Sequence, residues 1–271
     1  MPTHLINSIN LYYELINPDS TKATLVFFNG VMASASSWKD QVDVFKKLGY
    51  KILIHDLRGQ LKSDKPQGPY SFVQHAHDSV ELMKACGIDK AHLIGTSYGG
   101  EVALSIGIHF SEVVQSISVI NSVSELDQTL IRFVSSWKMM AQTYDGELFF
   151  RGMLPGVYHP TYLEKNKDLL DLRAKQFASI PKDYFDGQIA LYDTFMSDLN
   201  LTPYLHRIQV PVLIVAGEDD VLKPRRFSDI MANAMPHAQY ALIPQCGHVT
   251  IFEKPEVLAS LLCGFILNQI N

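Results

Sequence analysis

The sequence has few cysteines and no long apolar run. Its three cysteines, Cys86, Cys246 and Cys263, show no CxxC spacing, so neither a disulfide framework nor a zinc site is indicated. No stretch reaches the roughly 18 uninterrupted apolar residues of a membrane-spanning helix, and the amino terminus has no basic segment followed by an apolar one. We therefore expect reduced thiols, no membrane span and a cytoplasmic location, with leaderless export still open.

Clustered positive charge is missing as well. The 23 Lys and Arg residues are scattered among 28 Asp and Glu, which gives a formal net charge of −5 and argues against a nucleic-acid or anionic-lipid partner. No glycine-rich phosphate-binding loop is visible, and we predict no metal and no organic cofactor. His75 and His77 are two apart on a predicted helix and so point to different faces. They are predicted to be surface residues rather than a metal pair.

Short runs rich in Val, Ile, Leu and Phe alternate with helical stretches. A hairpin is predicted over residues 5–16, and the strands that follow are 24–28, 51–55, 92–95, 116–120, 212–216 and 240–243. The predicted helices are 37–48, 71–86, 98–109, 225–234 and 255–269. This alternation is typical of the α/β class, with a mainly parallel sheet of about eight strands and helices on both faces.

The alternation stops between residues 124 and 204. This segment shows helical patterns at 129–143, 168–179 and 184–197, a predicted loop from Pro155 to Pro160, and no clear strand. We predict a core domain formed by 1–123 and 205–271 and a helical lid formed by 124–204. Ligands of open α/β sheets bind at the carboxyl ends of the strands, where such an insert would cover the site. Most of its large apolar side chains are expected to pack within the insert, and the rest to line a pocket.

The motif Gly95-Thr-Ser97-Tyr-Gly99 lies between an apolar strand and a predicted helix. A serine at such a sharp turn has its hydroxyl raised above the sheet edge, and the next backbone N–H is free to bind an anion. The alternative is a glycine-rich turn in which Ser97 only caps the helix.

A serine hydroxyl needs a base to accept its proton and a third group to orient that base. The strand 212–216 runs into Gly217-Glu-Asp219-Asp220, and the last strand is followed by a loop ending in Gly247-His248. Taken singly, an aspartate here can cap the next helix and His248 can be an ordinary loop residue. Together, the order serine, acid, histidine at three predicted strand ends predicts a catalytic triad.

Cys246 lies two residues from His248, which suggests a cysteine nucleophile as an alternative. Neighbouring positions in a loop rarely bring a thiol and an imidazole into contact, so Ser97 is preferred.

The sequence resembles the α/β-hydrolase superfamily over essentially its full length. The segments that carry the resemblance are Phe27-Phe-Asn29-Gly30-Val31, Asp56-Leu-Arg58-Gly59 with Ser63, Gly95 to Gly99, Val212 to Asp220, and Gly247-His248. The resemblance implies that the acid is Asp220 rather than Asp219, and that the backbone N–H groups of Val31 and Tyr98 form an oxyanion hole. Asn29 and Leu61 depart from the residues most often found at these positions, a histidine and a glycine.

The predicted function is that of a serine hydrolase cleaving a carboxylic ester, thioester or lactone through an acyl-enzyme on Ser97. The substrate is expected to be a small, partly apolar acyl compound contacted by Asn29, Met32 and Trp137. One alternative is an acyltransferase that joins hydroxyacyl groups, because residues 29–38 and 204–209 are similar to the family that makes rhamnolipid precursors. Another is a ligand-binding receptor on the same fold. The oligomeric state stays open.

Overall fold

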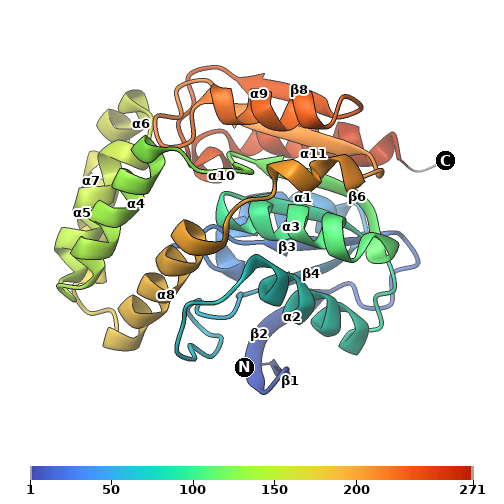
Figure 1. Ribbon diagram of the computed structural model, residues 1–271, viewed down its shortest axis with the longest axis horizontal. Coiled ribbons are helices and arrows are strands. Elements are labelled where there is room, and N and C mark those ends of the chain that lie inside the picture. The colour runs from blue at the N-terminus through green and yellow to red at the C-terminus, as the bar shows by residue number, and fades with distance from the viewer. Residues whose placement is uncertain (1, 270–271) are drawn as a thin grey trace.

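The computed structural model describes residues 2–269. An eight-stranded sheet lies at its centre (Figure 1). Its order is β1-β2-β4-β3-β5-β6-β7-β8. The strands are β1 Thr3–Ile6, β2 Ile9–Ile16, β3 Thr24–Phe28, β4 Lys51–His55, β5 Ala91–Thr96, β6 Val114–Ile120, β7 Val212–Gly217 and β8 Gln239–Ile243. β1 pairs antiparallel with β2, and β2 pairs antiparallel with β4. The six strands from β3 to β8 are parallel to one another. The predicted α/β class and mainly parallel sheet are confirmed.

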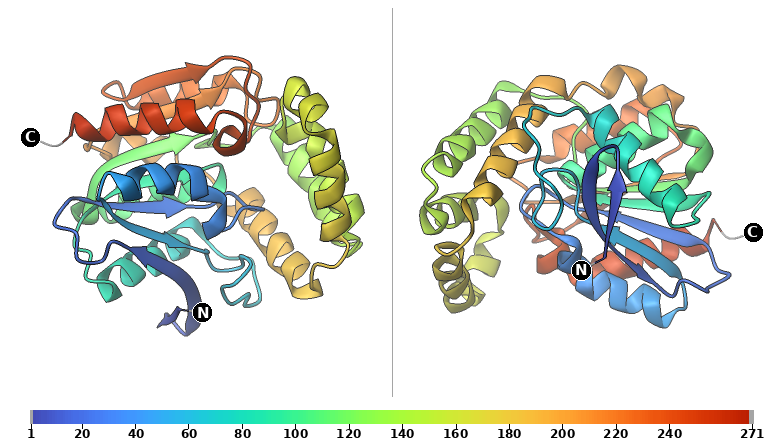
Figure 2. Two further views of the ribbon diagram at one scale, coloured as in Figure 1. Left: turned by 180° about the vertical axis from the view of Figure 1, so that it is seen from behind. Right: turned by 90° about the horizontal axis from the view of Figure 1, so that it is seen from below.

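Helices cover both faces of this sheet. The helices of the two faces are α1 Lys39–Lys47, α2 Phe72–Ala85, α3 Tyr98–His109, α9 Arg225–Ala234, α10 Thr250–Glu253 and α11 Pro255–Leu267, with short 3₁₀ turns η1 Ala35–Trp38, η2 Ser111–Val113 and η3 Thr202–Arg207. α2, α3 and α9 lie on the face toward the viewer in Figure 1, and α1 and α11 lie on the opposite face, seen from behind in Figure 2.

The central strand β3 shows why the sheet needs both layers. All five of its residues are buried, and their side chains alternate between the two faces. Leu25 and Phe27 belong to the apolar core that includes α1 and α11, whereas Val26 and Phe28 belong to the core that includes α2 and α3. A strand whose residues are buried on both faces is therefore stable only between two helical layers.

Five helices lie between β6 and β7, in the segment predicted to be the insert. They are α4 Gln128–Ala141, α5 Gly146–Val157, α6 Pro160–Lys165, α7 Lys167–Phe177 and α8 Lys182–Asp198. Figures 1 and 2 show α4 to α7 as a layer beside the sheet, on the side away from the C-terminus. We call α4 to α8 the helical wall. No helix within residues 2–269 has both the length and the apolar content needed to cross a bilayer.

The predicted loop from Pro155 to Pro160 is wrong. α5 continues through Pro155 to Val157, and only Tyr158 and His159 separate it from α6. Pro155 lies in the last turn of α5, so the hydrogen bond that it cannot donate is lost close to the helix end. Pro160 begins α6, where a missing N–H leaves no helical hydrogen bond unmade.

Candidate active site

Ser97 occupies a tight turn between β5 and α3. Its backbone has φ 51° and ψ −122°, in the left-handed region that side chains rarely adopt. A Cβ on Gly95 would lie 2.3 Å from the carbonyl oxygen of Gly99, and a Cβ on Gly99 would lie 2.1 Å from that of Phe28. The two glycines of the motif are therefore required for strand, turn and helix to pack this closely.

Three side chains from separate strand ends meet at this turn. His248 Nε2 lies 3.0 Å from Ser97 Oγ, and His248 Nδ1 lies 2.7 Å from Asp220 Oδ2. Ser97 follows β5, Asp220 follows β7, and His248 lies in the loop after β8. The side chains of Asp220 and His248 are almost completely buried. The structure thus brings together the three residues that the sequence singled out.

The Asp220 carboxylate is held by four hydrogen-bond donors. Oδ1 accepts from the backbone N–H groups of Leu222 and Lys223 at 3.0 and 2.8 Å, and Oδ2 accepts from His248 and from Asn121 Nδ2, the latter at 2.9 Å. Burial acts to raise the pKa of Asp220, but the charge and hydrogen bond of His248, with the other donors, lower it overall. Asp220 is therefore an anion near neutral pH, suited to stabilising a positively charged imidazole.

Asp219 is placed differently. Its side chain is 46% exposed, and its carboxylate lies 3.4 Å from His159 Nε2. It forms no hydrogen bond or ion pair with His248, so the carboxylate paired with the imidazole is that of Asp220.

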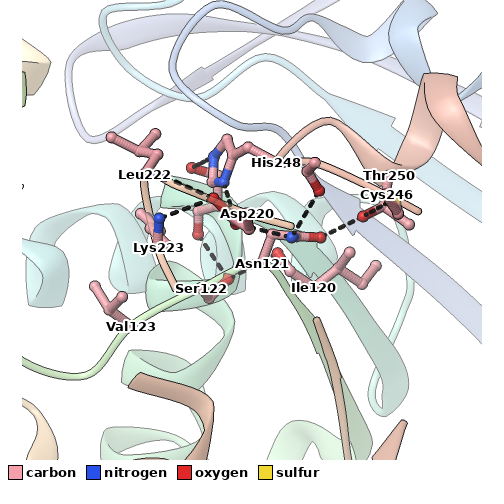
Figure 3. Close-up of polar contacts among 12 residues, drawn as sticks. Ile120, Asn121, Ser122, Val123, Asp220, Leu222, Lys223, Cys246, His248 and Thr250 are labelled. Atoms are coloured by element: carbon pink, nitrogen blue, oxygen red, sulfur yellow. Dashed lines mark hydrogen bonds and ion pairs between the residues drawn. The ribbon is translucent and has the colours of Figure 1, made fainter. Parts of the chain in front are cut away.

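Asn121 is a further member of the site that the sequence reasoning did not identify. Figure 3 shows it between Asp220 and Thr250: Nδ2 donates to Asp220, and Oδ1 accepts from Thr250 Oγ1 at 2.5 Å. Nδ2 also lies 3.3 Å from the carbonyl oxygen of Gly247. Its φ of 49° is a conformation that asparagine tolerates better than most residues. The signal that would have found it is a polar residue immediately after the buried strand 116–120.

Two backbone N–H groups lie in the segments that pack beside Ser97. The N–H groups of Val31 and Tyr98 have no hydrogen-bond acceptor among residues 2–269. Tyr98 is the first residue of α3, where the helix dipole favours negative charge. A Cβ on Gly30 would lie 3.3 Å from Ser97 Cβ, so the loop that carries Val31 packs directly against the serine. The two amides are available to an oxygen bound next to Ser97.

A cavity of about 530 Å³ opens above Ser97 and His248, within the size range of small-molecule sites. The helical wall contributes mainly apolar side chains to it: Trp137, Phe150, Met153, Leu154, Val157 and Phe177. Met32 and Trp137, two of the predicted substrate contacts, line this cavity. Much of the rest of the wall packs on itself, as in the contact of Phe149 with Phe185 at 5.7 Å between ring centroids.

Asn29 is placed away from the cavity, which disagrees with its predicted substrate contact. It is completely buried, and its Nδ2 lies within hydrogen-bond distance of His55 O, Asp56 Oδ1 and Gln60 Oε1. Its Oδ1 accepts from the indole N–H of Trp38 at 3.0 Å. Since these partners occupy both polar atoms, Asn29 fixes the loop after β3 instead of contacting a ligand.

The prediction that His75 lies on the surface is also wrong. His75 is fully buried in α2, and its Nε2 lies 2.9 Å from the hydroxyl of Tyr98. Burial, with the nearby Arg58 and His55, lowers its pKa to about 3. His77 lies on a different face of the helix and is half-exposed. No cluster of metal-ligating side chains occurs within residues 2–269.

Cys246 is unsuited to act as a nucleophile. Its thiol is buried and lies 3.5 Å from Thr250 Oγ1, and burial is the main cause that raises its pKa to about 12. A thiol that stays protonated at neutral pH is a poor nucleophile.

Known proteins resemble this chain over nearly all of its length. A protein of Azorhizobium caulinodans named "Putative carbamate hydrolase RutD" is 24% identical over 259 residues, which cover 94% of each chain. The solved structure of MGS-M2, an α/β hydrolase from a Medee basin deep-sea metagenome library, has a TM-score of 0.90 and 25% identity, covering 98% of this chain and 97% of that one. Est816, described as an N-acyl homoserine lactone degrading enzyme, has a TM-score of 0.81 and 25% identity, covering 97% and 100%.

The sequence also matches the α/β hydrolase fold family over residues 23–255. This span runs from the start of β3 to the start of α11 and includes Ser97, Asp220 and His248. The protein belongs to the α/β hydrolase family of enzymes.

Proposed function

We propose that the protein is a serine hydrolase that cleaves a carboxylic ester, thioester or lactone through an acyl-enzyme on Ser97. The observation that carries this proposal is the continuous hydrogen-bonded path from Ser97 through His248 to Asp220 beneath an apolar cavity. The similarity to Est816, an enzyme that degrades a lactone, supports the substrate class.

In the proposed acylation step, the Ser97 hydroxyl attacks the acyl carbon while His248 Nε2 takes its proton. Asp220 holds the proton on Nδ1, so Nε2 presents its lone pair to the serine. Collapse of the tetrahedral intermediate breaks the bond to the alcohol, thiol or ring oxygen, and His248 returns the proton to that leaving group. Water then repeats the sequence with the acyl-enzyme and releases the free acid.

The N–H groups of Val31 and Tyr98 are proposed to hold the oxyanion. Preorganised donors of this kind act on charge that develops in the transition state, and the loss of one typically costs about 3 kcal/mol of transition-state stabilisation. Asn121 is proposed to position the Asp220 carboxylate through their 2.9 Å hydrogen bond.

Residues 124–204 are proposed to act as a lid. This segment forms the helices α4 to α8 between β6 and β7. Apolar side chains of these helices line the cavity. Such a wall excludes water and favours a partly apolar acyl or alcohol group.

The proposal is tested with a panel of ester, thioester, lactone and carbamate substrates, the last included because of the name of the Azorhizobium relative. We expect Ser97→Ala and His248→Ala to lower kcat by about 10⁴-fold or more while leaving the fold intact, and a fluorophosphonate to label wild type but not Ser97→Ala. Ser260→Ala, which changes a serine of α11 that bonds Glu256 O, is the control. Near-normal turnover by Ser97→Ala would overturn the proposal.

Product analysis with a hydroxyacyl thioester separates hydrolysis from acyl transfer. Free hydroxy acid is expected; accumulation of a dimeric ester would instead indicate an acyltransferase.

A further inference from the structure

One face of α7 forms part of the cavity wall. Arg173, Gln176 and Phe177 are spaced i, i+3 and i+4 and all line the cavity, followed by Ile180 just beyond the helix. This spacing places their side chains in one stripe on the helix. Most of the cavity wall is apolar, so the guanidinium of Arg173 stands out chemically.

Arg173 has no acidic partner. It is half-buried, and no carboxylate within residues 2–269 lies within 4.0 Å of its nitrogens. Its guanidinium carbon lies 5.8 Å from the centre of the Phe252 ring, which also lines the cavity. By contrast, Arg58, Arg151 and Arg226 each form an ion pair with an aspartate.

Glu253 is an acidic group that follows Phe252 in the chain, and it forms no ion pair within 4.0 Å with Arg173. Its Oε2 accepts hydrogen bonds from the backbone N–H groups of Gly247 and His159 at 3.0 and 3.3 Å. Burial is the main cause that raises its pKa, and these hydrogen bonds act in the opposite direction. Arg173 thus lines the cavity without a carboxylate of residues 2–269 paired to its guanidinium.

Tyr158 lines the cavity together with Arg173. Burial raises the pKa of Tyr158 to about 12, and Arg173 is one of the groups that act in the opposite direction. The phenol therefore stays protonated and remains a hydrogen-bond donor. Arg173, Tyr158 and the amide of Gln176 together offer charged and neutral donors from one side of the cavity.

We propose that Arg173 binds a carboxylate of the substrate, so that the enzyme prefers esters, thioesters or lactones that carry this second, anionic group on a short apolar spacer. A guanidinium in a partly desolvated, mainly apolar wall recognises a carboxylate by paired, charge-assisted hydrogen bonds. The apolar side chains of Phe150, Met153 and Phe177 would contact the spacer. The inference rests on the proposed function, because it assumes that Ser97 attacks the other end of the same molecule.

The test compares each charged ester with its neutral counterpart. The probes are the 4-nitrophenyl monoesters of adipic, pimelic and suberic acids and the same compounds with the free carboxyl converted to its methyl ester. Rates are corrected with Ser97→Ala for spontaneous hydrolysis. We expect wild type to prefer the charged member at one or more lengths, and Arg173→Gln to lower kcat/KM for that member by about 10- to 100-fold while changing the neutral member less than threefold.

Two further variants sharpen this test. Arg173→Lys keeps the charge but loses the paired geometry, so it should retain part of the preference. Arg207→Gln removes a guanidinium that lies over Tyr204 and does not line the cavity, and it should behave as wild type. Equal rates for charged and neutral esters in wild type, or equal losses for both in Arg173→Gln, would overturn the inference while leaving the proposed hydrolase function standing.

Binding without turnover separates the two proposals. In calorimetry, Ser97→Ala should bind monomethyl suberate with a Kd at least tenfold lower than that for dimethyl suberate. This difference in Kd should vanish when Arg173→Gln is added. If this binding difference is found but wild type hydrolyses none of the esters, the proposed function fails and the anion site remains. If hydrolysis is found without the binding difference, the anion site fails.

Discussion

The two walls of the cavity are built on different principles. At the sheet edge, Asp220, Asn121 and His248 are buried and joined by short hydrogen bonds that come from separate strand ends. In the helical wall, the cavity is bounded mainly by apolar side chains, and the guanidinium of Arg173 pairs with no carboxylate of residues 2–269. We propose that the first wall fixes the positions of the reacting groups and that the second determines which molecule fits against them.

The difference teaches where substitutions should affect rate and where they should affect selectivity. A buried hydrogen-bonded network leaves unpaired groups behind when one member is removed, which is costly. An apolar surface loses only contact area and adapts by repacking. The following experiments test this contrast, from the largest expected effect to the smallest.

Asp220→Asn should lower kcat by about 10⁴-fold. The backbone N–H groups of Leu222 and Lys223 both donate to Oδ1, so the amide oxygen of the variant takes that position and its NH₂ group faces His248 Nδ1. The proton then resides on Nε2, where it blocks acceptance of the serine proton. Steady-state kinetics checks this, with the exposed neighbour Asp219→Asn as a matched control that should stay near wild type. A small effect at position 220 would remove Asp220 from the proposed mechanism.

Lys223→Met should lower the free energy of unfolding by about 3–5 kcal/mol. Lys223 Nζ lies 2.7 Å from Glu101 Oε1, and both side chains are buried, so the variant leaves a buried carboxylate without its cation. Urea denaturation measures the change, and adding Glu101→Gln should recover most of it. The exposed pair of Arg225 and Asp229 is the control, since Arg225→Met should cost less than about 1 kcal/mol. Equal losses in the two pairs would contradict the expectation.

Asn121→Gly should lower kcat/KM by about 10- to 100-fold, because it removes a hydrogen bond to a buried charge while keeping the positive φ accessible. The lost donor favoured ionised Asp220, so the pKa of Asp220 should rise, and an NMR titration of its carboxyl carbon measures that change. Thr250→Val removes only the hydroxyl that donates to Asn121 and should have a smaller effect in the same direction. An unchanged pKa of Asp220 would show that Asn121 has a purely structural role.

The free energy of unfolding should decrease as the pH falls from about 6.5 toward 4. Burial lowers the pKa of His92 to about 4 and that of His55 to about 4, with His75 at about 3. The unfolded chain therefore binds more protons in this range, and each histidine contributes a slope of about 1.4 kcal/mol per pH unit. Denaturation at several pH values should show a shallower slope for His92→Gln and an unchanged slope for the exposed control His77→Gln. Parallel slopes in all three proteins would refute this account.

Phe177→Leu should produce the smallest effect, a shift of about tenfold or less in the ratio of kcat/KM between long and short acyl esters. Phe177 lines the cavity from the helical wall, and leucine fills less of the same apolar surface. An ester series of graded chain length measures the ratio. Leu172→Ala, on the exposed side of the same helix, should leave it unchanged. A loss of kcat common to all esters would mean that this wall takes part in the chemistry.

The sheet and the meeting of Ser97, Asp220 and His248 were predictable because each depends on local sequence. Strands buried on both faces are largely apolar runs. Ser97 directly follows β5, and Asp220 and His248 lie in the short loops after β7 and β8. Parallel strands then bring these ends to one edge of the sheet. The turn at Ser97 was also predictable, because its close backbone contacts require a glycine on either side of Ser97, at Gly95 and Gly99.

The failed predictions involve partners that are distant in sequence. Asn29 is held by the side chains of Asp56, Gln60 and Trp38. The sequence pattern around residue 29 does not predict these contacts. His75 is buried because Tyr98 of the next helix packs on it. Pro155 is accommodated because α5 ends two residues later, which propensity alone does not specify. The orientation of Arg173 toward the cavity likewise depends on how α7 packs.

The left-handed backbone at Ser97 has a consequence for how this chain can evolve. A residue with a side chain pays a conformational penalty in that geometry, whereas glycine adopts it freely. Replacement by glycine would therefore relax the turn and raise the melting temperature, while it removes the hydroxyl that we propose attacks the substrate. If that proposal holds, the sequence gives up thermal stability at this position in exchange for a reactive group.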